Sequence, residues 1–264
     1  MNHLFFTINA SSSQPFIAMA IHHGHALRPG ISRYINITDR QRLREEDPFT
    51  GQWTIVAPIQ VICFHSRFQV DLNRPREKAI YETPDDAWGI KVWKFPLPEN
   101  EKVLSLAEYD RFYFELKKLL DVIIREFGYC IIYDLHSYNA IRDNKIGDSI
   151  DNPDINIGTS HMNRKVWGFL IDQLINDLRS FDMLDRQLDV RENVKFKGGY
   201  LTQWIYEQYG DLCCPIAIEI KKFFMNEITG LPDANQMTLF GQALQYTTIK
   251  LHERAKQCLL SKVL

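Results

Sequence analysis

The chain has 264 residues, of which 45% are hydrophobic and 12% aromatic, and this is enough material for one α/β domain spanning 1–264 with a sizeable core. Its 31 basic and 33 acidic residues nearly balance, which excludes the basic footprint of a protein that binds nucleic acid or an anionic membrane. We therefore expect a small polar molecule as its partner, while the composition leaves the oligomeric state open.

Apolar runs that end in polar clusters mark the predicted strands of the first quarter of the chain. A short strand is expected within Met1–Gln14, and the apolar run Phe16–Ile21 leads into the stretch His22–His25. Residues 29–51 are polar and show no sustained period, so we expect a loop with at most one helical turn. The run Ile59–Phe64 is rich in β-branched residues and predicts the next strand.

The middle of the chain combines a proline-rich loop with the clearest helix of the sequence. Four prolines and little periodicity predict a long loop over Pro75–Pro98, and long ordered loops in compact domains are usually functional. From Ser105, the predicted N-cap, apolar residues recur at helical spacing until Gly128. The following apolar run, Tyr129–Leu135, predicts a strand that leads into His136.

The last part of the chain alternates further helices and strands. Residues 139–159 are rich in Asn, Asp and Gly and predict a loop, and the helix Ser160–Phe181 follows with its first residue as N-cap. A helix after Gly198-Gly199, a strand at Pro215–Ile220 and a terminal helix over about 234–263 complete the chain. Strands that alternate with long helices favour a mainly parallel or mixed central sheet with helices on both faces.

Cysteines and apolar runs indicate the cellular compartment. Five cysteines, an odd number without Cys-x-x-Cys spacing, predict reduced thiols rather than a disulfide framework. No run approaches the roughly 20 apolar residues of a membrane helix. The apolar patch Leu4–Phe6 has no basic region before it and no cleavage site after it. We therefore expect a cytoplasmic protein.

Polar residues gather at the expected carboxyl ends of four strands. In an open α/β sheet these ends converge on one side, so residues far apart in the sequence can share a site. Imidazole is the commonest protein ligand for zinc, and histidines at two strand ends therefore predict a metal site. The four groups are His22–His25, Arg67–Arg74, Asp134–His136 and Glu219.

Each of these groups also has a simpler interpretation. The imidazoles of His22–His25 would merely hydrogen-bond to the backbone of a polar loop. Glu219 lies in an otherwise apolar strand, where an unpaired charge is costly, so it is either functional or paired with Lys221 or Lys222. Asp134 either orients a metal ligand or accepts backbone hydrogen bonds at the strand end.

Several segments resemble those of the N-formylglutamate amidohydrolase family, in the family's order, over about His22–Gly230. They are Glu45–Thr50, Ser66–Arg74, Tyr133–Ser137, Pro153–Thr159, Gly198–Tyr200 and Ile218–Glu227. Asp71–Arg74 and Asp134–His136 are also similar to the Asp-Leu-Asn-Arg and Asp-Leu-His segments of aspartoacylases. The resemblance implies a zinc carboxypeptidase-like fold and a metal-dependent hydrolase of N-formylglutamate or a similar N-acyl amino acid.

The resemblance also implies a set of metal ligands. In the wider zinc carboxypeptidase-like group a histidine and a glutamate three residues later form the first ligand pair, and the histidine of Asp-Leu-His is the third ligand. Mapped onto this chain, the ligands of one zinc ion are His22, His25 and His136, with His23 as the alternative to His25. A histidine thus stands where the group has a carboxylate, and three neutral imidazoles still suit zinc.

Roles for further residues follow from the same resemblance. Glu219 resembles the general base, which takes a proton from metal-bound water and passes it to the leaving nitrogen. Asn73 and Arg74 resemble the pair that binds the substrate's carboxylate, for which guanidinium offers a matching planar fork. Arg67 is a second candidate for that contact or for polarising the scissile carbonyl, with a surface ion pair as the alternative. Asp71 is expected to hold the loop that aims Arg74.

Two alternatives to an amidohydrolase remain open. One is a carboxypeptidase-like zinc peptidase, which would use the same residues on a carboxyl-terminal peptide bond. The other is a binding protein that has kept the fold and lost hydrolysis, and the altered stretch His22–His25 favours it.

Overall fold

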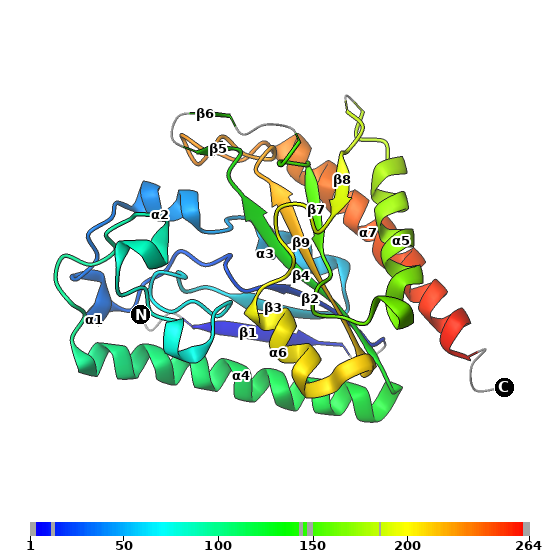
Figure 1. The fold of residues 1–264 in the computed structure, drawn as a ribbon, viewed down its shortest axis with the longest axis horizontal. Coiled ribbons are helices and arrows are strands. Elements are labelled where there is room, and N and C mark those ends of the chain that lie inside the picture. Colours follow the sequence, from blue (N-terminus) through cyan, green and yellow to red (C-terminus); the bar gives the residue numbers. More distant parts are fainter. Residues whose placement is uncertain (1–3, 12–13, 143–144, 147–149, 185, 261–264) are drawn as a thin grey trace.

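The computed structural model describes residues 4–11, 14–142, 145–146, 150–184 and 186–260. Its centre is a seven-stranded sheet with the strand order β1-β3-β2-β4-β9-β7-β8 (Figure 1). The strands are β1 (Phe6–Ala10), β2 (Phe16–Ala20), β3 (Ile59–Cys63), β4 (Cys130–Tyr138), β7 (Ile155–Gly158), β8 (Val190–Glu192) and β9 (Cys213–Lys221). A separate two-stranded sheet pairs β5 (Ile141–Arg142) with β6 (Lys145–Ile146).

The sheet is mixed, with a parallel centre. β2 pairs in parallel with both β3 and β4, and β4 pairs in parallel with β9. Strand β1 is antiparallel to β3, and β7 is antiparallel to β9 but parallel to β8. The expected mixed α/β sheet is confirmed, and the carboxyl ends of β2, β4 and β9 meet at one edge.

Two helices cover each face of the sheet (Figure 1). Helices α4 and α6 pack on one face, and α5 and α7 pack on the other. The helices are α1 (Pro29–Ser32), α2 (Asp39–Glu45), α3 (Thr50–Trp53), α4 (Glu99–Phe127), α5 (Arg164–Ser180), α6 (Tyr200–Tyr209) and α7 (Ala234–Leu260). Short 3-10 turns are η1 (Thr54–Val56), η2 (Arg76–Lys78), η3 (Pro84–Ala87) and η4 (Gly210–Leu212).

Strand β2 explains why the run of residues that precedes His22 is continuously apolar. Ile17 and Met19 pack in the α4 side of the core, while Phe16 and Ala18 pack in the α5 and α7 side. All five residues of the strand are buried, since helices cover both faces. A buried parallel strand therefore delivers the polar residues that follow it to the edge of the sheet.

Two helix starts differ from the prediction. Helix α4 begins at Glu99, because Pro98 occupies the N-cap and acidic residues fill the first turn, where they favour the helix dipole. Ser105, the predicted cap, is instead fully buried inside this helix. Helix α5 is capped by the side chain of Asn163, which accepts from a backbone N–H of the first turn, and not by Ser160.

Short elements occupy the stretches predicted as loops. Helix α2 has seven residues, and its sequence signal is the capping box of Thr38 and Gln41. Strand β7 lies within the predicted loop 139–159, where Ile155 and Ile157 alternate with polar residues over too few positions to stand out. The expected long loop after Pro75 is confirmed and holds only 3-10 turns among its described residues.

Two further expectations concern the cysteines and the helices. All five cysteines are free, and four of them are buried. None of the helices in the described part of the chain combines the length and apolar character that crossing a membrane requires.

Candidate metal centre and active-site cleft

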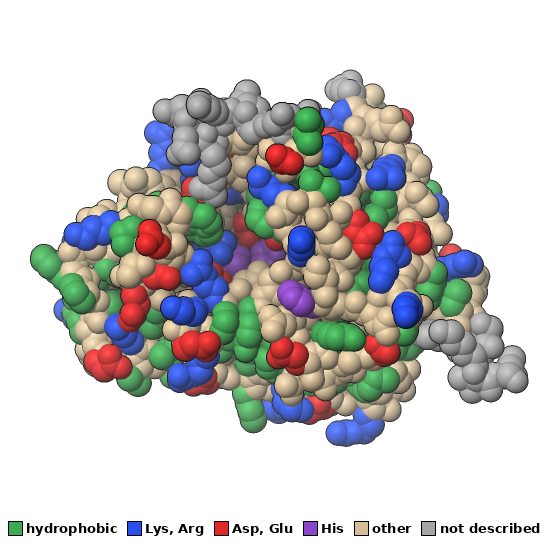
Figure 2. All heavy atoms as spheres, in the orientation of Figure 1, with side chains coloured by type: hydrophobic (Ala, Val, Ile, Leu, Met, Phe, Trp, Pro, Cys, Tyr) green, Lys and Arg blue, Asp and Glu red, His purple; other side chains and the backbone are tan. Residues whose placement is uncertain are grey.

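A cleft of about 340 Å³ lies at the carboxyl edge of the central strands. His22 follows β2, His136 lies in β4 and Glu219 lies in β9, and all three line this cleft. Figure 2 looks onto this face and shows histidine side chains inside a hollow near the middle of the view. The other lining residues are Glu45, Asp47, Arg67, Asn73, Trp88, Ser137–Asn139, Lys195–Gly199 and Lys222.

Three buried side chains converge at the floor of the cleft. His22, Asp47 and His136 each offer one ligand atom, and these atoms lie within 4.8 Å of one another. Asp47 Oδ2 is 3.0 Å from His136 Nδ1 and 3.3 Å from His22 Nδ1. Two imidazoles and one carboxylate at an open cleft form the donor set that hydrolytic zinc sites use.

The orientation of both imidazoles fits a divalent metal ion. His22 Nε2 is 2.7 Å from Asp71 Oδ1, and His136 Nε2 is 3.0 Å from Asp134 Oδ1. In this structure His136 Nδ1 lies within hydrogen-bond distance of the Asp47 carboxylate; with a metal ion bound, a carboxylate at Nε2 would keep the proton on that nitrogen and leave the Nδ1 lone pair for the ion. His22 Nδ1 is buried and has no hydrogen-bond partner in the part of the chain that the structure describes. The residues present therefore fit a metal ion between the two Nδ1 atoms and Asp47.

Electrostatics keep the carboxylates of this centre ionised. Burial by itself would raise the pKa of Asp47, but the hydrogen bond with His136 and the close imidazole of His22 outweigh it and lower that pKa far below its usual value. The pKa of Asp71 is likewise held well below its usual range, because Arg67 and His22 more than offset the effect of burial. Asp47 is thus anionic, which is the form that binds a cation.

His25, the predicted second ligand, lies outside this cluster. Its Nδ1 is 2.5 Å from Glu46 Oε2, the Arg42 guanidinium donates to its Nε2 at 3.2 Å, and its side chain is 37% exposed. Gly24 packs so tightly that a Cβ there would lie 2.1 Å from the carbonyl carbon of Phe64. This close approach fixes the chain direction, and His25 leaves the cleft.

His23, the alternative to His25, also lies outside the cluster. Its ring packs against Gly51, where an added Cβ would lie 2.7 Å from the imidazole. Burial lowers the pKa of His23, with Asp47 opposing the effect. Of the ligands expected within His22–His25, the structure brings only His22 into the cluster with Asp47 and His136.

Asp47 takes the carboxylate position that His25 was expected to fill. Sequence reasoning missed it because it ends a charged run, Asp39–Asp47, in which no single carboxylate stands out. The feature that could have identified Asp47 was its position in Glu45–Thr50, a segment that resembles the N-formylglutamate amidohydrolase family. Its backbone N–H donates to the carbonyl of His22 at 2.9 Å, and the Ser137 hydroxyl donates to Oδ1 at 3.1 Å.

Glu219 lies beside His136 in the ladder between β9 and β4. Its side chain is partly buried, and no described residue donates a hydrogen bond to its carboxylate. Burial raises the pKa of Glu219 to about 7; His136 opposes this rise, and Asp47 and Asp134 add to it. A carboxylate with this pKa is suited to exchange protons near neutral pH.

The alternative of an ion pair for Glu219 is wrong in this structure. Lys221 pairs with Asp154, with 2.8 Å between Nζ and Oδ1. Lys222 donates to the backbone carbonyls of Arg44 and Glu46. Both neighbouring lysines are therefore engaged elsewhere.

Arg67 is held at the cleft wall by three neighbours. Its guanidinium donates to Asp71 Oδ2 at 2.8 Å and to the Tyr81 hydroxyl at 2.9 Å. It also lies over the ring of Trp88, 5.0 Å from the centroid. Trp88 itself is 46% exposed and has a φ of 54°, a conformation that non-glycine residues rarely adopt. The Asp71 carboxylate therefore contacts both the Arg67 guanidinium and the His22 imidazole.

The predicted pair Asn73 and Arg74 is split by the structure. Asn73 lines the cleft, and its Oδ1 accepts from the backbone N–H of Leu201 at 3.0 Å. Gly199 permits this approach, since a Cβ there would lie 2.2 Å from Asn73 Oδ1. Arg74 is not among the cleft residues; it donates to the carbonyl of Asp86 at 2.5 Å and lies over the Tyr81 ring.

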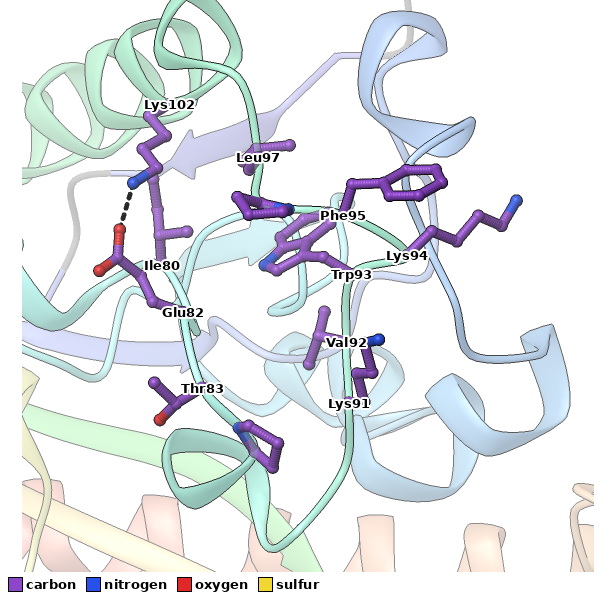
Figure 3. A pocket seen from close by; sticks show the side chains of 12 residues that line it. Ile80, Glu82, Thr83, Lys91, Val92, Trp93, Lys94, Phe95, Leu97 and Lys102 are labelled. Atoms are coloured by element: carbon purple, nitrogen blue, oxygen red, sulfur yellow. Dashed lines mark hydrogen bonds and ion pairs between the residues drawn. The ribbon is translucent and has the colours of Figure 1, made fainter.

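A second cavity, of about 400 Å³, lies beside the loop that precedes α4 (Figure 3). Val92, Trp93 and Leu97 are buried residues in its wall, while Phe95 is 71% exposed. Its residues are Ile80, Glu82–Pro84, Lys91–Leu97 and Lys102. Glu82 is the one carboxylate among them and pairs with Lys102, as Figure 3 shows. This cavity is larger than the cleft, but its ionisable residues are three lysines and Glu82, without a histidine or a second carboxylate.

Comparisons with known proteins agree with this geometry. A family model described as N-formylglutamate amidohydrolase matches residues 14–225. No curated protein matches the chain. Among solved structures, the chain resembles an N-formylglutamate amidohydrolase from Ralstonia eutropha JMP134, with 18% identity and a TM-score of 0.75, over 96% of this chain and 98% of that one.

Two further solved structures align with the chain. A gene product from Agrobacterium tumefaciens is 15% identical, with a TM-score of 0.68 and 96% of each chain covered. A metallo-carboxypeptidase from Burkholderia cenocepacia is 13% identical, with a TM-score of 0.39 over 95% of this chain and 61% of that one. The likeness to the Ralstonia and Agrobacterium proteins shows a shared fold.

Proposed function

Because the chain belongs to the N-formylglutamate amidohydrolase family, we propose that it hydrolyses the amide bond of N-formylglutamate or a similar N-acyl amino acid with the help of one zinc ion. The observation that carries this proposal is the convergence of His22, Asp47 and His136 next to a partly buried Glu219 in one cleft. A metal ligand set and a carboxylate with a raised pKa are the two parts that hydrolysis of an unactivated amide needs.

His22, Asp47 and His136 would hold the metal, and Asp71 and Asp134 would orient the two imidazoles. A divalent ion at this position supplies a Lewis acid and lowers the pKa of water. Since Asp47 is anionic and both imidazoles present Nδ1 toward it, the chain supplies the donors without a large rearrangement.

Glu219 is the proposed general base. Its pKa of about 7 lets the carboxylate take a proton from the attacking water and give it to the leaving nitrogen within one reaction cycle. The carboxylate is free for this work, because no described residue donates to it. Its position beside His136 places it next to the metal ligands.

Arg67 is the proposed contact for an anionic part of the substrate or for the oxygen of the scissile carbonyl. Its guanidinium lines the cleft and is fixed by Asp71 and Tyr81, so little side-chain entropy is lost on binding. Asn73 lies on the same lining. Arg74, which the sequence favoured for this contact, is engaged by the loop and acts at most through its neighbours.

Cationic side chains on the lining of the cleft, which also holds Glu45, Asp47 and Glu219, support an anionic substrate. Lys195 and Lys197 line it in addition to Arg67, and both lysines are exposed. An N-acyl amino acid with two carboxylates offers a partner for more than one of these cations. This feature favours N-formylglutamate within the proposed substrate class.

The altered stretch His22–His25 favoured the alternative of a binding protein that has lost hydrolysis. That argument is weaker once Asp47 supplies the carboxylate that the stretch lacks. The proposal of an amidohydrolase therefore stands ahead of the binding protein.

Metal analysis and a substrate panel test the proposal. We expect the purified protein to hold about one equivalent of zinc after reconstitution, and to release amine fastest from N-formylglutamate among N-formyl, N-acetyl and N-succinyl amino acids. The free amine is measured after each incubation. Zinc-loaded protein that releases amine from no member of the panel would contradict the proposal.

A further inference from the structure

Lys222 is a buried lysine at the cleft for which the proposed reaction has no use. Its side chain follows the end of β9 and is 3% exposed. Nζ donates to the backbone carbonyls of Arg44 at 2.5 Å and Glu46 at 2.8 Å, and to Oδ1 of Asn139 at 3.0 Å. A buried ammonium is costly unless its donors are satisfied, so these bonds need an explanation.

The number of acceptors around Lys222 shows whether its ammonium has an N–H left to donate to a substrate. An ammonium group has three N–H donors, and the three acceptors use all of them. No carboxylate of the described residues forms an ion pair with it. Lys222 therefore has no donor left for a substrate, although it lines the cleft.

The three acceptors belong to segments that carry metal ligands. The backbone of 44–46 leads directly into Asp47. Asn139 comes three residues after His136, just beyond the end of β4. A single ammonium group thus joins the end of β9 to the segment that delivers Asp47 and to the strand that delivers His136.

The side chains of the segment that delivers Asp47 have several partners, and Lys222 is the side chain that donates to its backbone carbonyls at Arg44 and Glu46. Helix α2 ends at Glu45, and Glu46 is already extended, with a ψ of 175°. The last carbonyls of a helix have no partners within it, and a cation at this end satisfies them and favours the helix dipole. Lys222 supplies that cation to Arg44, in the last turn of α2.

We propose that Lys222 is a positioning residue that sets the place of Asp47 in the metal centre. The inference rests on the proposed metal centre and adds a residue whose action on the metal is indirect. Loss of the ammonium would leave three acceptors without their donor and would remove the link between segment 44–46 and the end of β9, while Asn139 would still donate to Glu45. Metal binding would weaken, whereas the cleft wall at Arg67 would keep its contacts.

Lys222→Met tests this proposal, because methionine keeps much of the apolar stem and removes every donor. Lys221→Met is the matched control: its ammonium pairs with Asp154 and with the carbonyl of Asn152, away from Asp47. Metal-free proteins are titrated with zinc against a chromophoric chelator. We expect wild-type affinity for Lys221→Met and an affinity about ten- to a hundredfold weaker for Lys222→Met.

Kinetics supply a second readout that a general loss of folded protein would not give. At saturating zinc we expect the KM of Lys222→Met for N-formylglutamate to stay within about twofold of wild type, because the substrate contacts are unchanged. At limiting zinc its rate should fall in proportion to metal occupancy and recover when zinc is added. Circular dichroism verifies that each variant is folded.

Unchanged zinc affinity in a folded Lys222→Met protein would overturn the inference. If that variant does not accumulate in folded form, Asn139→Ala takes its place, since it removes one of the three acceptors. A weaker zinc affinity for Asn139→Ala then supports the inference, and an unchanged affinity overturns it. Wild-type protein that binds no zinc would instead contradict the proposed function, so the two failures are distinguishable.

Discussion

The cleft and the cavity beside residues 80–97 differ more in chemistry than in size. The cavity beside residues 80–97 measures about 400 Å³, and the cleft at the strand ends measures about 340 Å³. The larger one is mostly apolar, whereas the smaller one contains buried histidines and carboxylates. Volume alone therefore does not identify the active-site region, whereas buried ionisable groups with shifted pKa values do.

The two regions also differ in how they are built. The larger cavity is formed by a single stretch, residues 80–102, which packs in an apolar cluster with Ile31, Ile35, Ile37 and Phe68. The cleft gathers residues from strands and loops far apart in the chain; Asp47 and His136, for example, are 89 positions apart. We therefore expect substitutions in the cleft to change catalysis, and substitutions at the other cavity to leave it unchanged.

The largest effect is expected from Glu219→Gln. The amide cannot accept the proton, so kcat should fall by about 10²- to 10⁴-fold. Zinc content should remain as in the wild type, because Glu219 is not among the proposed ligands. Steady-state rates on N-formylglutamate with parallel metal analysis check this, and turnover at the wild-type rate would remove Glu219 from the mechanism.

Two arginine substitutions compare a residue of the cleft lining, Arg67, with a neighbour outside it, Arg74. Arg67→Ala removes a charged donor from the wall and should lower kcat/KM by about 10- to 100-fold, in line with about 1.5–3 kcal/mol for a hydrogen bond to a charged group. For Arg74→Ala the loss of kcat/KM should be at least tenfold smaller than for Arg67→Ala, because Arg74 lies outside the cleft lining. A larger loss for Arg74→Ala than for Arg67→Ala would restore the order that the sequence suggested.

The raised pKa of Glu219 predicts a pH-dependent stability of the metal-free protein. Its pKa is about 7 in the fold and 4.5 as the ordinary value, so the folded state binds the extra proton between these pH values. This contribution to stability is complete below pH 4.5 and is lost as the pH rises through about 7.

Urea unfolding of wild type and Glu219→Gln in EDTA, at pH 5 and pH 8, measures this contribution. Because the group is partly exposed to solvent, we expect the wild type to lose about 2 kcal/mol relative to the variant over this interval. A difference between the two proteins that is independent of pH would show that Glu219 titrates at its ordinary value.

The smallest effect is expected at the larger cavity. Phe95 lines it and is 71% exposed, so Phe95→Ser should change the free energy of unfolding by no more than about 0.5 kcal/mol. The kcat/KM for N-formylglutamate should also stay within about twofold of wild type. A tenfold change in activity would contradict this expectation, because it would show that the larger cavity affects the reaction.

The sequence predicts the parts of the site that long buried strands deliver. His22, His136 and Glu219 follow or end apolar runs, and such runs in a parallel sheet end at one edge. The central strands and the long helices were predictable for the same reason. Strands β7 and β8 were missed because four and three residues are too few for a reliable period.

The parts that sequence reasoning missed depend on contacts between loops. Asp47 reaches the metal centre from the end of a two-turn helix, and no local pattern separates it from Glu45 and Glu46. His25 leaves the centre because Gly24 packs against the backbone of Phe64. These placements are set by tertiary packing, which a single sequence does not display.

The identity of the second metal ligand tests the account most directly. Zinc content is measured by plasma mass spectrometry for wild type, His25→Ala and Asp47→Asn after the same reconstitution and desalting. We predict about one equivalent for wild type and for His25→Ala, and a loss of most of the metal from Asp47→Asn, whose neutral amide is a poor ligand for zinc. Metal retained by Asp47→Asn and lost from His25→Ala would contradict the account.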